Sequence, residues 1–107
     1  MRELLPLRRH AETFTMRFGN QNAEYAITIG RYEDGRLGEV FIDGAKDGSE
    51  MAFIARDGAI LISLALQYGV PLSTLRHSIS RDGKDNAATL IGAVIDQITQ
   101  HEEPKNE

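Results

Sequence analysis

The residues best suited to chemistry lie in the loop between Asp43 and Glu50, where a predicted strand leads into a predicted helix. The candidate ligand-binding residues of this loop are Gly44, Lys46, Gly48 and Ser49. Backbone N–H groups at a helix start attract anions, and a lysine and a hydroxyl would add to that attraction, which predicts a phosphate or nucleotide site. The alternative is an ordinary turn capped by Ser49, because the P-loop spacing is absent and the acidic residues of the loop would repel an anion.

Other catalytic or metal-binding constellations are not assembled in the sequence. The chain has no cysteine, which excludes disulfides, thiolate metal sites and a cysteine radical. Its histidines, His10, His77 and His101, do not have the spacing of known metal-binding motifs, and Ser63 in the apolar run has no base near it in the sequence. We therefore expect no catalytic residue, no metal site and no cofactor in this chain.

Length and charge narrow the class of protein. A chain of 107 residues has the common size of one domain, and its formal net charge of -4 does not suit a protein that neutralises nucleic-acid phosphates. The apolar runs are too short to span a bilayer, and the N-terminus does not resemble a signal peptide. We expect a cytoplasmic protein that binds neither nucleic acid nor membrane.

The elements that must position the loop begin with three strands. Apolar and polar residues alternate over 13–18 and 25–30, and 37–42 continues with a further strand pattern. The turn-forming residues 19–22 separate the first pair, and Asp34-Gly35 gives the hairpin signal between the second pair. This pattern predicts a three-stranded antiparallel sheet.

Three helices are predicted after the sheet. The first runs from Glu50 to Tyr68 and ends at Gly69, the second runs from Pro71 to about Ile79, and the last begins near Asn86. Strands followed by helices indicate an α+β fold, which we expect to have two layers with the long central helix buried.

The central helix is apolar on nearly every side over 59–66, so it must be covered on several sides. The rest of the chain can cover it, or another protein can, and we therefore predict self-association or a protein partner.

The predicted organisation is an arm at 1–10, a folded domain at 11–100 and a disordered tail at 101–107.

The folded region resembles a known domain family over most of its length. The matching segments are Gly30, Tyr32 to Gly35, Gly38 to Ile42, Ala45-Lys46, Gly48-Ser49 and the gap-free run from Ile62 to Leu72. These segments are similar to the C-terminal domain of adenosylcobalamin-dependent ribonucleotide reductases, which is named TSCPD after a Thr-Ser-Cys-Pro-Asp motif. This chain departs from the family in having neither that motif nor any cysteine.

The resemblance implies kinship with an accessory domain and not the reductase activity. In those enzymes the radical cysteine and the cobalamin and nucleotide sites belong to a large barrel that this chain does not contain. The resemblance therefore implies a non-catalytic module linked to nucleotide metabolism, with a ribonucleotide reductase as a candidate partner. A nucleotide- or phosphate-binding module that uses the 44–49 loop is the alternative.

Overall fold

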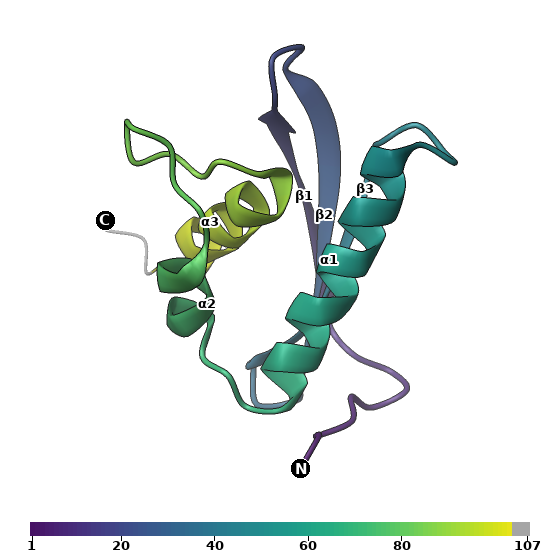
Figure 1. Cartoon of the computed structure of the whole chain (residues 1–107). Helices are drawn as coiled ribbons and strands as arrows, with labels where there is room; N and C mark the ends of the chain where they lie inside the picture. Colours follow the sequence, from purple (N-terminus) through teal and green to yellow (C-terminus); the bar gives the residue numbers. More distant parts are fainter. Residues whose placement is uncertain (104–107) are drawn as a thin grey trace, which may run out of the picture. The chain divides into compact units, whose positions relative to one another are not determined.

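The structure, a computed structural model, describes residues 1–103 and divides the chain into two compact units, Met1–Val70 and Pro71–Glu107. The elements are β1 (Ala11–Phe18), β2 (Ala23–Arg31), β3 (Leu37–Asp43), α1 (Glu50–Gln67), α2 (Leu72–Ser78) and α3 (Leu90–Glu102) (Figure 1). Three antiparallel strands followed by three helices confirm the predicted α+β order. The single-domain organisation stays a prediction.

The sheet has the strand order β1-β2-β3, and both hairpins form where the turn residues predict them. In the first hairpin Phe14 pairs with Ile27 across a turn in which Gly19 has a φ of 91°. In the second hairpin Ile27 pairs with Ile42, and Gly35 has a φ of 93°. Glycine accepts these positive φ values without a Cβ clash, which explains why the chain reverses at these points.

The two faces of the sheet differ in chemistry. One face carries buried apolar side chains that are neighbours across the strands, namely Met16, Tyr25, Ile27, Ile29, Val40 and Ile42. The opposite face is open and more polar. On it the hydroxyls of Thr13 and Thr28 lie 2.9 Å apart in a hydrogen bond, while Phe41 is 48% exposed. The alternation of residues along each strand therefore gives one core face and one accessible face.

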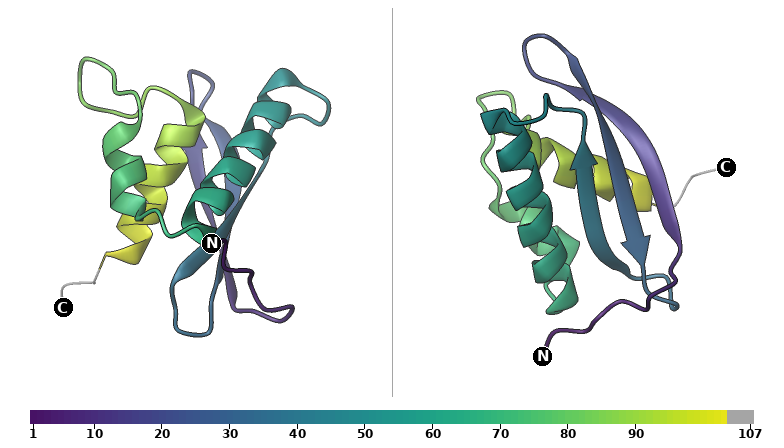
Figure 2. Two further views of the ribbon diagram at one scale, coloured as in Figure 1. Left: turned by 60° about the horizontal axis from the view of Figure 1, so that its bottom comes forward. Right: turned by 90° about the vertical axis from the view of Figure 1, so that its right-hand side faces the viewer.

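Helix α1 lies beside the outer edge of β3 (Figure 2). The Ser63 hydroxyl accepts a hydrogen bond from the backbone N–H of Val40 at 2.8 Å, and the Gln67 side-chain amide donates to the backbone C=O of Gly38 at 2.8 Å. A strand edge exposes unpaired backbone groups that invite aggregation, and these two side chains pair two of them. Helix α1 therefore protects this edge of the sheet.

The expectation that α1 is buried holds for one side of the helix only. Its buried residues are Ala55, Ala59, Ile62 and Gln67. Large apolar side chains on another side remain exposed, and Leu61 keeps 66% of its surface accessible. The reason is geometric, because a helix beside a strand edge presents only part of its circumference to the sheet.

The N-terminal arm, predicted at residues 1–10, has no helix or strand and is bound to the rest of the first unit. The backbone N–H of Glu3 donates to the C=O of Gln67 at 2.8 Å, and the Tyr32 hydroxyl donates to the C=O of Glu3 at 2.5 Å. The Glu3 carboxylate also pairs with the Arg36 guanidinium at 2.8 Å. These contacts fix the arm next to the C-terminal end of α1.

The second unit joins α2 to α3 through an ordered loop. Helix α3 begins at Leu90, later than the predicted start near Asn86, because Thr89 accepts a hydrogen bond from the Gly92 N–H and caps the helix. The helix continues to Glu102, two residues into the segment 101–107 for which we expected disorder. Residues 104–107 lie outside the described residues. None of the helices in residues 1–103 combines the length and hydropathy that a bilayer crossing requires.

Candidate functional site

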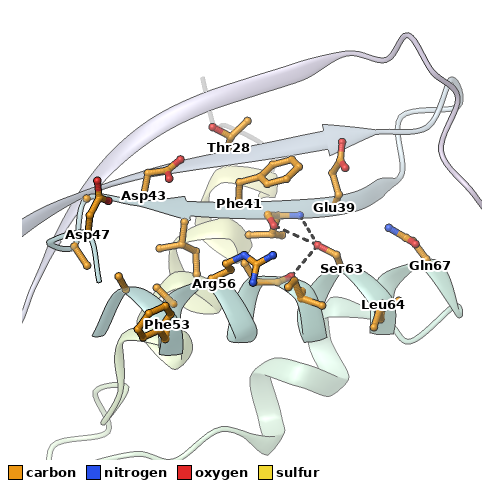
Figure 3. A pocket seen from close by; sticks show the side chains of 18 of the residues that line it. Thr28, Glu39, Phe41, Asp43, Asp47, Phe53, Arg56, Ser63, Leu64 and Gln67 are labelled. Carbon is orange, nitrogen blue, oxygen red and sulfur yellow. Dashed lines mark hydrogen bonds between the residues drawn. The ribbon is translucent and has the colours of Figure 1, made fainter. Parts of the chain in front are cut away.

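A groove of about 780 Å³ lies between α1 and β3, within the first unit (Figure 3). Phe41 on the open face of the sheet and Phe53 on α1 give it apolar walls. Between them α1 contributes small residues such as Ala52 and Ala59, which leave space where larger side chains would fill it. Grooves of this size and mixed lining are typical of binding sites.

The two ends of the groove carry opposite charges. Asp43 and Asp47 line the end next to the loop that enters α1, whereas Arg2 and Gln67 line the end next to the N-terminal arm. The Arg2 Nε donates to the Gln67 side-chain oxygen at 2.6 Å, which is a neutral partner, so the arginine charge is not compensated by this bond. Within residues 1–103 neither aspartate has an ion-pair partner.

An ion pair between a β3 residue and the arm lies near the arm end of the groove. Glu39 lines the groove and forms an ion pair with Arg9 of the arm. The hydrogen bond to this carboxylate raises the pKa of Arg9 further above its ordinary value. Gly30 makes room for the pair, because a Cβ at Gly30 would lie 2.7 Å from the Glu39 Cγ. No pattern in the sequence indicates this pairing, because Arg9 and Glu39 are 30 positions apart.

The middle of the groove contains polar groups that are already satisfied. The Ser63 hydroxyl contacts the N–H and C=O of Val40 and the C=O of Ala59, as the dashed lines in Figure 3 show. The bond to Ala59 is a back-bond to a carbonyl one turn earlier in the same helix. Arg56 extends from α1 into the groove between the charged ends. Ser63 is therefore structural, while Arg56 is available to a bound molecule.

The predicted loop residues fall into two groups. Gly44 and Gly48 line the groove, with φ values of 129° and 76°, but Lys46 and Ser49 are not among the lining residues. The Ser49 hydroxyl accepts from the Ala52 N–H at 3.1 Å and donates to the Lys46 C=O at 2.5 Å. This is the helix cap that the sequence offered as the alternative, and it occupies the hydroxyl. Whether the loop binds an anion stays a prediction.

The side of α1 that faces away from its buried residues, together with Phe41, forms what we call the α1 apolar surface. It consists of Phe41, Phe53, Ile54, Ile60, Leu61 and Tyr68, whose exposed fractions run from 42% to 66%. The intervals from Phe53 to Ile60 and from Leu61 to Tyr68 are both seven residues, which places these side chains on one stripe of the helix. The exposed Asp57 lies between Phe53 and Ile60 on the same side, so the apolar side chains surround one carboxylate. Clusters of exposed apolar side chains mark interaction sites.

The histidines do not form a metal centre in the part of the chain that the structure describes. No group of three or more metal-type ligands occurs in residues 1–103. His10 lies 3.1 Å from a Glu12 carboxylate oxygen, and His77 is exposed on α2. The structure brings none of these side chains to the groove.

Comparison with known proteins identifies the family. The TSCPD domain model matches residues 2–101, and the chain belongs to this family. Among curated proteins it is similar to vitamin B12-dependent ribonucleotide reductases of Bradyrhizobium diazoefficiens, 44% identical over 66% of this chain, and of Rhodopirellula baltica, 39% identical over 74%. The chain spans only 6% and 7% of the length of these two relatives. No solved structure matches the chain significantly.

Proposed function

We propose that this chain is a non-catalytic protein-interaction module whose docking surface is the α1 apolar surface with the adjoining groove. The supporting observation is the exposure of large apolar side chains on a helix that already protects a strand edge with its other side. Burying such side chains contributes about 25 cal/mol per Å² of apolar area, so their exposure favours association. Because the matched relatives are named as reductases of ribonucleotides, we place the module beside nucleotide reduction.

The groove supports binding better than catalysis. Catalysis needs a nucleophile or base within hydrogen-bond reach of a reacting atom, and Ser63 uses its hydroxyl on backbone groups of β3 and α1. Asp43, Asp47 and Arg2 lie at the ends of the groove, Arg56 lies between them, and Glu39 is paired with Arg9. They are suited to orienting a partner at the rim of an interface.

The test is a charge placed in the α1 apolar surface. Leu61→Glu puts a carboxylate on a side chain that is 66% exposed, so the fold is expected to survive while docking weakens at least about 10-fold. Leu7→Glu is the matched control, because Leu7 is fully exposed on the arm. Binding is measured by calorimetry against a vitamin B12-dependent ribonucleotide reductase that lacks its own TSCPD domain, and self-association by light scattering. Equal behaviour of the two variants in both assays contradicts the proposal.

The alternative function is a nucleotide- or phosphate-binding module, which a different observation favours. Gly44 and Gly48 bring the loop backbone to the groove, and Arg56 extends into the same space. Titrating nucleoside diphosphates and inorganic phosphate while recording backbone amide NMR signals tests it. Shifts confined to residues 44–49 and Arg56 support the alternative, and unchanged signals in this segment exclude it.

A further inference from the structure

We propose that the occupant of the α1 apolar surface is a second copy of this chain, docked so that the two α1 helices run antiparallel about a two-fold axis. This inference rests on the proposed function and names the partner of the same surface. A two-fold pairing uses one patch on both copies, so the patch must be complementary to itself when it is turned end over end. The charges and the apolar stripe of α1 both meet this requirement.

The charges of the groove are arranged for such a partner. The acidic end, with Asp43 and Asp47, and the arginine end, with Arg2, lie at opposite ends of the groove beside α1. Antiparallel docking brings the acidic end of each copy to the arginine end of the other, and does so twice. Parallel docking would place like charges together at both ends, which is unfavourable. Arg56 lines the groove, whereas Asp57 lies on the apolar stripe between Phe53 and Ile60, so the two charges do not cancel and the Asp57 carboxylate opposes the contact.

The apolar stripe has the same two-fold symmetry. Helix α1 has 18 residues and is therefore about 27 Å long. When the two-fold axis passes between Ile60 and Leu61, Ile60 of one copy faces Leu61 of the other. Phe53 of one copy then faces Tyr68 of the other near each end of the contact. Paired aromatic rings prefer such contacts and contribute beyond the area they bury. Phe53, Ile60, Leu61 and Tyr68 thus each obtain an apolar neighbour, while Ile54 faces Gln67.

The hydrogen bonding of β3 decides what kind of contact the groove accepts. An added strand would need free backbone groups along the β3 edge, but the Val40 N–H is bonded to Ser63 and the Gly38 C=O is bonded to Gln67. Strand addition at this edge would break both bonds. The groove therefore binds through side chains, which suits a helix surface such as α1 of a second copy.

The experiment is a charge exchange between the two ends of the groove. Arg2→Asp alone, and Asp43→Arg combined with Asp47→Arg, each place like charges at both ends of the dimer, and each is expected to weaken dimerisation roughly 10-fold at low salt. The variant with all three substitutions restores opposite charges and is expected to dimerise within about 3-fold of the original chain. Sedimentation equilibrium of the whole chain gives the dissociation constants, and unfolding curves show that every variant is folded.

The outcomes separate this inference from the proposed function. Weakening by Arg2→Asp and by the paired aspartate substitutions, with rescue when all three are combined, supports the antiparallel dimer. A chain that stays monomeric at high concentration overturns the second-copy proposal, yet the proposed function stands if Leu61→Glu abolishes binding to the reductase. A dimer that responds to Leu61→Glu without charge rescue overturns the antiparallel arrangement. A dimer insensitive to Leu61→Glu overturns the second-copy proposal, and the proposed function falls with it if binding to the reductase is equally insensitive.

Discussion

Ser63→Ala tests whether α1 protects the sheet edge through a single hydroxyl. In the folded chain the Ser63 Oγ accepts from the Val40 N–H at 2.8 Å, and Val40 is 2% exposed. Alanine removes this acceptor and leaves a backbone donor without a partner. An unsatisfied buried donor costs about 1–3 kcal/mol. Because the groove beside Ser63 is open and admits water, we expect the lower half of this range, about 1–2 kcal/mol.

The control for this substitution is Ser78→Ala in α2. The Ser78 hydroxyl also bonds back to a helix carbonyl, that of Thr74 at 2.7 Å, but it is exposed and supports no other element. Both substitutions replace serine by a better helix former and lose one back-bond, so these effects are common to the pair. The difference between the two variants therefore isolates the contacts of the Ser63 hydroxyl with the Val40 backbone, of which the bond from the N–H is the shorter.

Urea unfolding and thermal unfolding measure the effect. We expect Ser63→Ala to lower the free energy of unfolding by about 1–2 kcal/mol more than Ser78→Ala, which corresponds to a melting temperature lower by roughly 5–10 °C. Amide hydrogen exchange adds a local readout, because the Val40 N–H should lose protection first. If the two variants agree within about 0.5 kcal/mol and Val40 keeps its protection, the hydroxyl does not hold the edge and the reasoning is refuted.

Three further perturbations address the arm, the second unit and pH. Gly38→Ala would place a Cβ 2.6 Å from the Leu5 side chain, so the arm should detach and trypsin should cleave its arginines faster; unchanged cleavage would contradict this. Thr89→Ala removes the α3 cap and should lower the free energy of unfolding by about 1 kcal/mol in urea, and a loss near zero would show that the cap is dispensable. The Arg81 hydrogen bond holds the pKa of the Asp96 carboxyl below its usual value, so stability is present at neutral pH and is lost as acid protonates Asp96, below about pH 4. Asp96→Asn should remove this part of the acid sensitivity, and an acid unfolding curve unchanged in slope would argue against it.

The dimer proposed here would explain why an apolar surface is tolerated on a small domain. Exposed apolar surface of this extent promotes nonspecific aggregation unless it is covered or its partner is specified. Opposite charges at the two ends of the groove specify both the partner and its direction, because only antiparallel docking pairs them. A reductase chain would dock on the same surface and would displace the second copy from it.

The sequence by itself determined the order of the elements, the turns and the family. Alternating residues fixed the strands, Gly35 fixed the second hairpin, and Ser49 fixed the start of α1, because each of these signals is local. Local signals also have limits at the ends of elements. Helix α3 starts at Leu90 rather than near Asn86, because the Thr89 hydroxyl accepts a hydrogen bond from the Gly92 N–H and caps the helix there.

Only the tertiary structure decided which side of α1 is covered and where the groove lies. The apolar run over 59–66 gave no preferred direction, and the choice came from Ser63 and Gln67, whose polar groups meet the β3 edge. At one end of the groove Arg2 forms a hydrogen bond with Gln67, a residue 65 positions away in the chain. The periodicity of the sequence does not predict a contact of this kind. Long-range pairs of this kind depend on the packing of α1 against the sheet, which is why the site became visible only in three dimensions.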